Sequence, residues 1–438
     1  MDNESGSKLP HSIITSPTLA TAGLLVLGGG LGTLFRTLGR WPNLDARVPE
    51  ALALLLAGGV LYLAGVYLVE RFSLGAAALL VIVLGALAFR LVLLPHAPAL
   101  SDDVYRYQWE GRVERRGLNP YTVYPALPGL EQLQDPRHPI KTGPTVSTLY
   151  PPLSEIAFAA VRTIPGYKRL FTGLDLATIG VLLGLLAALK QPLHRVLVYA
   201  WNPGVIVAFA LSGHHDSLAI AALLFSCLFI ILRRPKLGIS FLALSCLSKF
   251  FAGLLLPIFL KRGRAAYAGI FAGIVALAYL PYAGAGRRLF QGLSDFAAGW
   301  EGNDSLFRLL RLAGNSKAQA GLVAGVIVLG LVVVALRQRL APLRSGLFLI
   351  AGLLFISPNA FPWYFTWMIP FLCLYPEAPL LLMSVTCVLG YAPVVAYAAG
   401  QPYRDSPFIV ALEYAPVYVW LAWEGLRALG KAKMETGN

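Results

Sequence analysis

The stretch LGAAALLVIVLGALAFRLVLL, from Leu74 to Leu94, contains one charged residue, Arg90. A helix needs about 20 apolar residues to cross the hydrocarbon core of a bilayer, so this stretch predicts a membrane-spanning helix. Similar stretches recur along the whole chain and predict roughly 11 to 13 spanning helices, which makes it an all-α, multi-spanning integral membrane protein. The other stretches are Thr18–Phe35, Ala51–Val69, Leu170–Leu189, Val196–Leu211, Ser217–Leu232, Leu237–Leu260, Ala265–Tyr282, Ala320–Leu336, Gly346–Ile356, Pro362–Tyr375, Pro379–Ala399 and Phe408–Leu429.

The composition agrees with a bilayer environment. The chain is 57% hydrophobic and 13% charged, whereas soluble domains carry about 25% charged residues. The formal net charge is +14, but its basic residues cluster at the ends of apolar stretches, a pattern typical of cytoplasmic loops and not of nucleic-acid binding. These clusters are Arg233–Lys236, Lys261–Arg264, Arg337–Arg339 and Lys431 with Lys433.

The basic clusters also predict a topology. Three apolar stretches precede His96, so cytoplasmic clusters put the amino terminus inside and the segment His96–Tyr150 outside. Arg233–Lys236 and Lys261–Arg264 both belong inside, yet only Leu237–Leu260 separates them. We therefore expect a broken hairpin that rises and returns, with Lys249 near its tip.

Two polar segments interrupt the apolar pattern, His96–Tyr150 and Gly284–Lys317. In the first, Asp102–Arg116 predicts a short interfacial helix, and the following Gly117-Leu118-Asn119-Pro120 predicts its end. The four cysteines all lie in apolar stretches without metal-ligand spacing, which predicts buried free thiols. The run Gly28–Gly30 lies in an apolar stretch and predicts close helix packing, not nucleotide binding.

Asp102 and Asp103 open the first polar segment, in the sequence SDDVYRYQWE. Carboxylates at the mouth of a membrane helix are costly, which makes them functional candidates. Adjacent carboxylates repel, so the pKa of one can rise until it suits a general base. Two alternatives remain open: Ser101 or Asp102 could cap the following helix, with an acid in its first turn, or the pair could hold a divalent cation.

Lys249 is the second candidate, because it interrupts an apolar stretch and no carboxylate lies near it in sequence. An intramembrane lysine of this kind indicates an anionic ligand such as a lipid phosphate, with a snorkelling side chain as the alternative. The turn His214-His215-Asp216 offers polar groups for a sugar or a phosphate. Adjacent histidines on a turn diverge, which argues against a mononuclear metal site there.

The segment Ser357–Trp367 is rich in aromatic residues, including Trp363 and Tyr364. Such residues form belts at membrane surfaces, and they also stack on sugars. The chain has no glycine-rich phosphate loop and no serine-hydrolase elbow. If it transfers a group, the donor is therefore not expected to be a soluble nucleotide.

Taken in order, five blocks resemble the GT-C superfamily of multi-spanning glycosyltransferases. The resemblance is nearest to mannosyltransferases that use a polyprenyl-phosphate sugar, among them the catalytic subunit of GPI mannosyltransferase I and its bacterial relatives. The acidic block has Asp-Asp where the family often has Asp-x-Asp, so the resemblance does not say which carboxylate is the base. The blocks are Ser101–Gly111 followed by Gly117–Tyr121, Leu149–Leu153, Asn202–Ser217, Ser248–Phe251 and Ser357–Trp367 with Ile369-Pro370.

The resemblance implies inverting transfer of a hexose, with mannose expected, from a polyprenyl-phosphate sugar to a hydroxyl on a lipid or glycan. We assign Asp102 or Asp103 as the base and expect no cofactor beyond a divalent cation that the acidic pair could hold. The other site residues predicted are Lys249, His214, His215, Asp216, Arg106 and Tyr150 for the donor, and Trp109, Tyr105, Trp363 and Tyr364 for the acceptor or an aromatic lining.

The resemblance also implies one GT-C domain over residues 1–438, in a bacterial inner membrane with its site facing the periplasm or exterior. We expect amino-terminal helices at 18–95, an outer segment at 96–150, core helices at 151–283, a second outer segment at 284–318 and carboxy-terminal helices at 319–430. A lipid or solute transporter is the main alternative and would show inverted repeats. A non-catalytic subunit of a glycan-assembly complex is the other.

Overall fold

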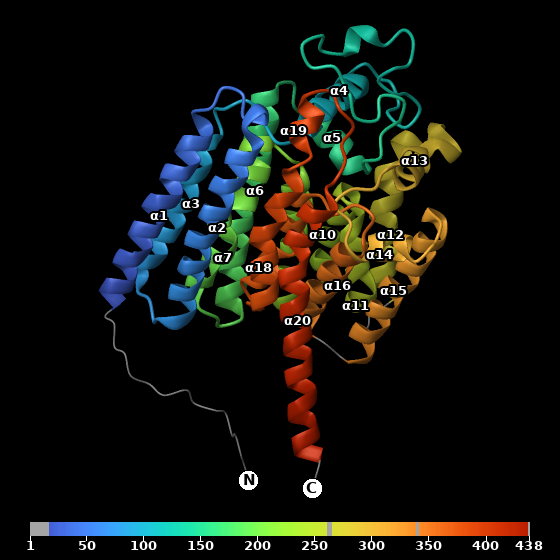
Figure 1. Cartoon of the computed structure of the whole chain (residues 1–438). Helices are drawn as coiled ribbons and strands as arrows, with labels where there is room; N and C mark the ends of the chain where they lie inside the picture. Colours follow the sequence, from blue (N-terminus) through green and yellow to red (C-terminus); the bar gives the residue numbers. More distant parts are fainter. Residues whose placement is uncertain (1–16, 261–264, 339–340, 437–438) are drawn as a thin grey trace.

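The computed structural model describes residues 17–260, 265–338 and 341–436 (Figure 1). Within these residues the regular elements are all helices, and β pairing is confined to isolated bridges. Seven described helices are long and apolar enough to span a membrane, or eight if the bent pair Leu193–Ala200 and Pro203–Ser212 forms one span. The chain is therefore an all-α, multi-spanning integral membrane protein, as the sequence predicted.

Part of the predicted basic clusters lies outside the described residues, namely Lys261–Arg264, Arg339 and the side chains of Lys431 and Lys433.

In chain order the helices are α1 (Pro17–Gly39), η1 (Asp45–Arg47), α2 (Val48–Arg71), α3 (Ala76–Leu93), α4 (Asp103–Arg115), η2 (Glu131–Leu133), α5 (Pro152–Ala160), α6 (Ile164–Ala188), η3 (Leu193–Val196), α7 (Leu197–Ala200), α8 (Pro203–Ile206), η4 (Val207–Ser212), α9 (Asp216–Ile231), α10 (Pro235–Ser248), η5 (Phe250–Leu255), α11 (Leu256–Leu260), α12 (Ala265–Tyr279), η6 (Leu280–Phe290), α13 (Gln291–Gly299), α14 (Leu306–Leu312), α15 (Lys317–Arg337), α16 (Pro342–Ile356), η7 (Pro362–Trp367), α17 (Ile369–Leu372), α18 (Ala378–Thr386), η8 (Cys387–Tyr391), α19 (Val394–Ala398) and α20 (Pro407–Thr436).

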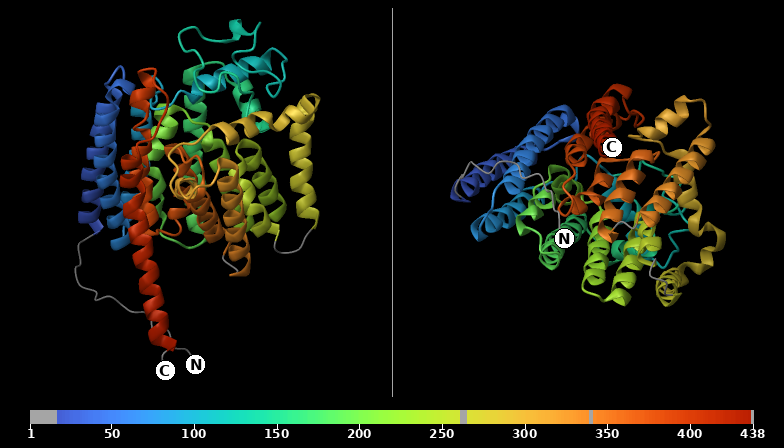
Figure 2. Two further views of the ribbon diagram at one scale, coloured as in Figure 1. Left: turned by 45° about the vertical axis from the view of Figure 1, so that its right-hand side comes forward. Right: turned by 90° about the horizontal axis from the view of Figure 1, so that it is seen from below.

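The long helices stand side by side, with α4 and α5 at one end of the bundle (Figure 1). Helices α1 to α3 lie at one side and α12 at the other (Figure 2). A Cβ atom at Gly28 would lie 2.9 Å from the ring of Trp201, and one at Gly30 would lie 2.9 Å from a methyl of Leu61. The predicted close packing is thus confirmed at these two glycines. The four cysteines are free, also as predicted.

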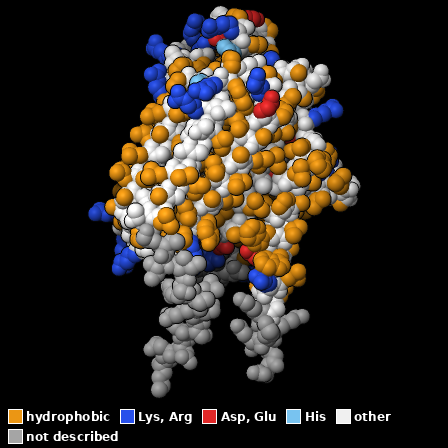
Figure 3. Space-filling model, turned by 60° about the vertical axis from the view of Figure 1, so that its left-hand side comes forward, with side chains coloured by type: hydrophobic (Ala, Val, Ile, Leu, Met, Phe, Trp, Pro, Cys, Tyr) orange, Lys and Arg blue, Asp and Glu red, His pale blue; other side chains and the backbone are white. Residues whose placement is uncertain are grey.

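Hydrophobic side chains cover the middle of the face shown in Figure 3, and lysines and arginines gather above and below them. Leu25, Val26 and Leu80 are among the exposed apolar residues of α1 and α3. A soluble protein rarely exposes so continuous an apolar surface, whereas a lipid-facing surface requires it. Basic residues at both ends of the band suit the headgroup regions of a bilayer.

The described helices that are long enough to span a membrane are fewer than the 11 to 13 spanning helices that the apolar stretches predicted. Several stretches form shorter apolar helices, namely α9, α10, Phe250–Leu260 and α16. The stretch Val196–Leu211 is bent by 60° at its middle. The break falls at Asn202, whose side chain accepts a hydrogen bond from the Val205 amide and so caps a new helix that Pro203 begins.

The chain reverses its direction at Lys249, between α10 and η5. The backbone there is extended, with φ −151° and ψ 132°, so α10 ends. The chain then runs back beside α10. Gly253 of η5 lies next to Cys246 of α10, because a Cβ atom at this glycine would lie 3.5 Å from the Cys246 sulfur. This geometry agrees with the predicted hairpin; the side of the membrane on which its ends lie stays a prediction.

The first outer segment contains the predicted short helix as α4, Asp103–Arg115. It ends before Gly117, whose φ of 72° is left-handed and favours glycine. Gly111 brings α4 against α5, because a Cβ atom at this position would collide with the carbonyl of Phe158. This close contact holds the second half of α4 against α5.

Candidate active site

A cavity of about 670 Å³ opens beside the start of α4. Its wall combines the first outer segment, the turn at Lys249, the loop around Trp300, η7 and α19. Segments far apart in sequence therefore converge on one space, as a substrate site requires. The predicted site residues that line it are Asp102, Asp103, Tyr105, Arg106, Tyr150, Lys249, Trp363 and Tyr364.

Asp102 occupies the N-cap position of α4, but its side chain makes no capping hydrogen bond. Its Oδ2 instead accepts a hydrogen bond of 2.8 Å from the Tyr397 hydroxyl. Burial, and then the charge of Asp103, raises the pKa of the Asp102 carboxyl to about 6. The capping alternative does not account for this side chain, which is turned toward the cavity wall.

Asp103 faces the inner part of the same wall. Its Oδ2 lies 3.5 Å from the Tyr107 hydroxyl and 3.5 Å from Nδ1 of His214. The His214 ring in turn stacks on Trp363, with ring centroids 4.1 Å apart. The two carboxylates therefore have different partners, although they are neighbours in sequence.

Lys249 has a carboxylate partner that its local sequence does not reveal. Its Nζ lies 2.5 Å from Oδ1 of Asp216, which is fully buried at the start of α9. Trp367 donates a second hydrogen bond of 2.7 Å to the same oxygen. The Lys249 ammonium also lies 4.5 Å from the centre of the Tyr364 ring. The snorkelling alternative does not describe this side chain, which is held in place at the cavity.

Four predicted site residues are buried behind the cavity wall. Asp216 is the partner of Lys249, and His214 lies between Asp103 and Trp363. The His215 ring packs edge-on against Tyr107 and Tyr150, each at 5.0 Å. These three residues thus lie behind the wall, and their predicted contact with the donor stays a prediction. They lie there because the turn points inward, so that all three are at most 1% exposed.

Trp109 is the fourth of these residues, and it packs with Val113, Val123 and Leu133 beneath the outer segment. Trp109 is not among the residues that line this cavity, because α4 turns it away, and its predicted role for the acceptor stays a prediction. Arg106 reaches the cavity, but its guanidinium bonds Glu110 at 2.6 Å and two loop carbonyls, those of Gly143 and Val146. It fixes the loop at the cavity wall.

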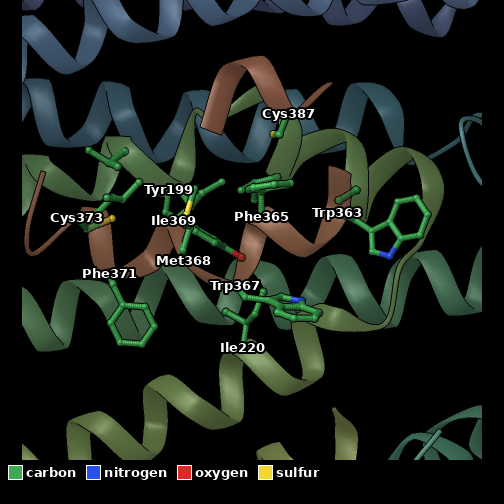
Figure 4. Close-up of a cluster of buried hydrophobic side chains, with 14 of the residues drawn as sticks. Tyr199, Ile220, Trp363, Phe365, Trp367, Met368, Ile369, Phe371, Cys373 and Cys387 are labelled. Carbon is green, nitrogen blue, oxygen red and sulfur yellow. The ribbon is translucent and has the colours of Figure 1, made fainter. Parts of the chain in front are cut away.

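The aromatic segment divides between the core and the cavity. Phe365, Met368 and Ile369 lie together in the buried cluster, whereas Trp363 lies to one side of them (Figure 4). Trp363 and Tyr364 line the cavity, and their contact with the acceptor stays a prediction. Tyr105 also lines it and stacks on His138, with ring centroids 4.2 Å apart.

The family model described as alpha-(1->6)-mannopyranosyltransferase, N-terminal domain, matches residues 18–262, which is more than half of the chain. The chain belongs to this family. No curated protein and no solved structure matched it. The match supports mannosyl transfer as the activity of this membrane protein, in agreement with the mannosyltransferase part of the predicted resemblance, and it favours a transferase over the transporter and subunit alternatives.

The family match includes Asp102, Asp103 and Lys249 but ends before Trp363 and Tyr397. Sequence reasoning missed Tyr397, which stands in an apolar stretch with no local motif to mark it. It also missed Thr142, whose hydroxyl lies 2.7 Å from that of Tyr397. Only the packing of α19 against the outer segment brings these groups to the acidic pair.

The carboxylates and histidines at the cavity are residue types that can bind a metal ion. In the part of the chain that the structure describes, no three His, Cys, Asp or Glu side chains gather as a metal ion would need. Asp102 and Asp103 have a tyrosine and a histidine as their nearest partners.

Proposed function

We propose that the chain is an inverting GT-C glycosyltransferase that moves mannose from a polyprenyl-phosphate donor to an acceptor hydroxyl. The observation that carries the proposal is the convergence of the Asp102 carboxylate and the Lys249 ammonium on one cavity of a mannosyltransferase-family membrane protein. A base and a cation are the two groups that such a transfer needs: one for the acceptor proton, the other for the leaving phosphate.

Asp102 acts as the general base in this proposal. A base works best when its pKa lies near the operating pH, and the pKa of Asp102 is about 6. About nine-tenths of the carboxyl is then ionised at pH 7. Asp103 is the second candidate, since it lines the same cavity and has Tyr107 and His214 as its neighbours.

Lys249 holds the donor phosphate in this proposal. An ammonium has three N–H donors, and the bond to Asp216 uses one of them. The others can bond phosphate oxygens, whose negative charge grows as the sugar departs. Asp216 orients the ammonium, and because Lys249 lies on an apolar hairpin, a lipid-borne phosphate can reach it from the bilayer.

The reaction balances as a single displacement. The acceptor oxygen attacks the anomeric carbon of mannose while its proton passes to Asp102. The bond from that carbon to the phosphate oxygen breaks, and its electron pair leaves with the lipid phosphate. An inverting enzyme that forms the α-(1→6) linkage named in the family description requires a β-linked donor. The expected donor is therefore β-mannosyl polyprenyl phosphate.

The cavity lies at the end of the bundle that carries α4 and α5 (Figure 1). The positive-inside rule puts this end outside the cytoplasm. We therefore propose a bacterial inner membrane with the cavity open to the periplasm or exterior. A lipid-linked donor suits that side, where soluble nucleotide sugars are not supplied.

The test uses the full-length protein in lipid nanodiscs with β-mannosyl polyprenyl phosphate and a short synthetic α-mannoside. We expect an α-(1→6)-linked product, with turnover reduced at least 100-fold in Asp102→Asn. GDP-mannose replaces the lipid donor in the control and should give no product. Turnover with GDP-mannose alone would exclude the lipid donor, and full activity of both Asp102→Asn and Asp103→Asn would exclude the acidic pair as base.

A further inference from the structure

Tyr397 comes from α19, and its hydroxyl contacts the acidic pair although it is 295 residues away from Asp102. It donates a hydrogen bond of 2.8 Å to Oδ2 of Asp102. A phenol has one proton, so the 2.7 Å contact between Tyr397 and Thr142 must have Thr142 as donor. The hydroxyls thus form a directed chain, Thr142 to Tyr397 to Asp102.

The position of Tyr397 is set by the way α19 ends. The amide of Gly400 bonds the carbonyl of Tyr397, and the amide of Gln401 bonds that of Ala396. Gly400 has a φ of 79°, so these bonds form a Schellman cap. The cap fixes the last turn of α19, from which the Tyr397 side chain projects into the cavity wall.

We propose that Tyr397 is a positioning residue for the general base: its hydroxyl, held by Thr142, fixes the Asp102 carboxylate and stabilises its ionised form. This inference rests on the proposed function, because it takes Asp102 as the base. Hydrogen bonds in such a chain polarise one another, which strengthens the bond to the carboxylate. A bond made to the ionised form opposes the effect of burial on the pKa of Asp102.

Other charged and titratable groups face Asp102 from the elements packed around it, and they determine the background on which Tyr397 acts. Asp103 raises the Asp102 pKa, whereas the ammonium of Lys141 lowers it. Tyr105 on α4 and Asp45 on η1 also line this cavity, and the charges of Asp45 and Asp102 both act on Tyr105. Tyr397 is the group among these that donates a direct hydrogen bond to the carboxylate.

The test compares Tyr397→Phe with the parent protein by pH profiles of kcat and kcat/KM. Without the Tyr397 hydroxyl, the ionised carboxylate is less stable. The acid limb of each profile, the range in which the rate falls at low pH, should therefore move up by about one pH unit. We expect kcat to fall about tenfold at pH 7, about twofold of it from the smaller ionised fraction and the rest from the lost positioning of the carboxylate, while KM for the donor stays within twofold. A merely structural tyrosine would not displace the limb.

Two further variants complete the test. Thr142→Val should move the limb in the same direction by a smaller amount, and it gives the answer if Tyr397→Phe fails to fold. Tyr418→Phe also removes a tyrosine hydrogen bond, here to Ser305 and away from the cavity, and should leave the limb unmoved.

An unmoved acid limb in a folded Tyr397→Phe, or in Thr142→Val if that variant alone folds, overturns the inference. Asp102→Asn separates this failure from failure of the proposed base. If Asp102→Asn is inactive and the tyrosine variant has the parent profile, the inference alone is wrong. If Asp102→Asn is active, the base assignment is wrong and the inference falls with it.

Discussion

Lys249 and Asp216 form an ion pair of 2.5 Å between the tip of the α10–η5 reversal and the start of α9. Asp216 is fully buried, and 14% of the Lys249 side chain is exposed at the cavity. The negative charge also lies at a helix N-terminus, where the helix dipole favours it. The pair thus places a cation at the cavity while its counter-charge stays out of reach of substrate.

The stability of this pair can be tested with a double-mutant cycle. Lys249→Met leaves the Asp216 carboxylate buried without its cation, which should cost about 3–5 kcal/mol of unfolding free energy. Lys249→Met with Asp216→Asn removes both charges and should recover most of that loss. Thermal unfolding of purified protein in detergent measures both effects. Asp216→Asn alone completes the cycle, and a loss in the double variant equal to the sum of the two single losses would show that the charges are not coupled.

Tyr364 should contribute to donor affinity through its ring. The Lys249 ammonium lies 4.5 Å from the ring centre, a distance at which the ring attracts and orients a cation. Tyr364→Leu should raise the donor KM about 2- to 30-fold, the range expected from about 0.5–2 kcal/mol. Tyr364→Phe keeps the ring and is the matched control. A KM that rises equally in both variants would assign the effect to the hydroxyl.

The rate should depend on pH through Asp102. Because its folded pKa is raised to about 6, kcat/KM should fall as the pH decreases through that value. The charge of Asp103 contributes to this elevation, so Asp103→Asn should move the acid limb to lower pH, by up to about one unit. Steady-state rates between pH 4.5 and 8 give the profile. A limb that moves upward in Asp103→Asn would contradict the coupling.

The buried carboxyl of Glu155 in α5 predicts a pH-dependent stability. Burial, followed by the charge of Glu110, holds the Glu155 pKa well above its ordinary value. The folded state therefore keeps a proton that the unfolded state releases, so stability falls as the pH rises above the unfolded pKa of about 4.3. Glu155→Gln keeps an acceptor for the Thr148 hydroxyl and cannot ionise.

At pH 8 we expect Glu155→Gln to unfold about 1–3 °C above the parent protein, and the difference should vanish near pH 4. Glu424→Gln changes an exposed carboxyl and serves as the control. Melting curves in detergent at both pH values test this prediction. A variant that is less stable than the parent at pH 8 would show that the Glu155 carboxyl is needed in its ionised form.

Much of the candidate site could be anticipated because its signals are local. An acidic pair at the end of an apolar stretch and a lysine inside another are visible without any tertiary contact. Trp109 and the turn His214-His215 were predicted to meet substrate, but polarity and aromaticity do not reveal the direction in which a side chain points. That direction depends on how α4 and α9 pack, which buries all three side chains.

The sequence by itself determined the membrane class, the helical architecture and the position of the acidic pair, because hydropathy over about 20 residues is a local property. Tertiary structure alone decided that Asp216 pairs with Lys249 and that Tyr397 bonds Asp102. These partners are 33 and 295 positions apart, and neither partnership follows from local pattern. Burial in a packed, poorly solvated interior makes such contacts necessary, since each charge there must find a partner wherever the fold supplies one.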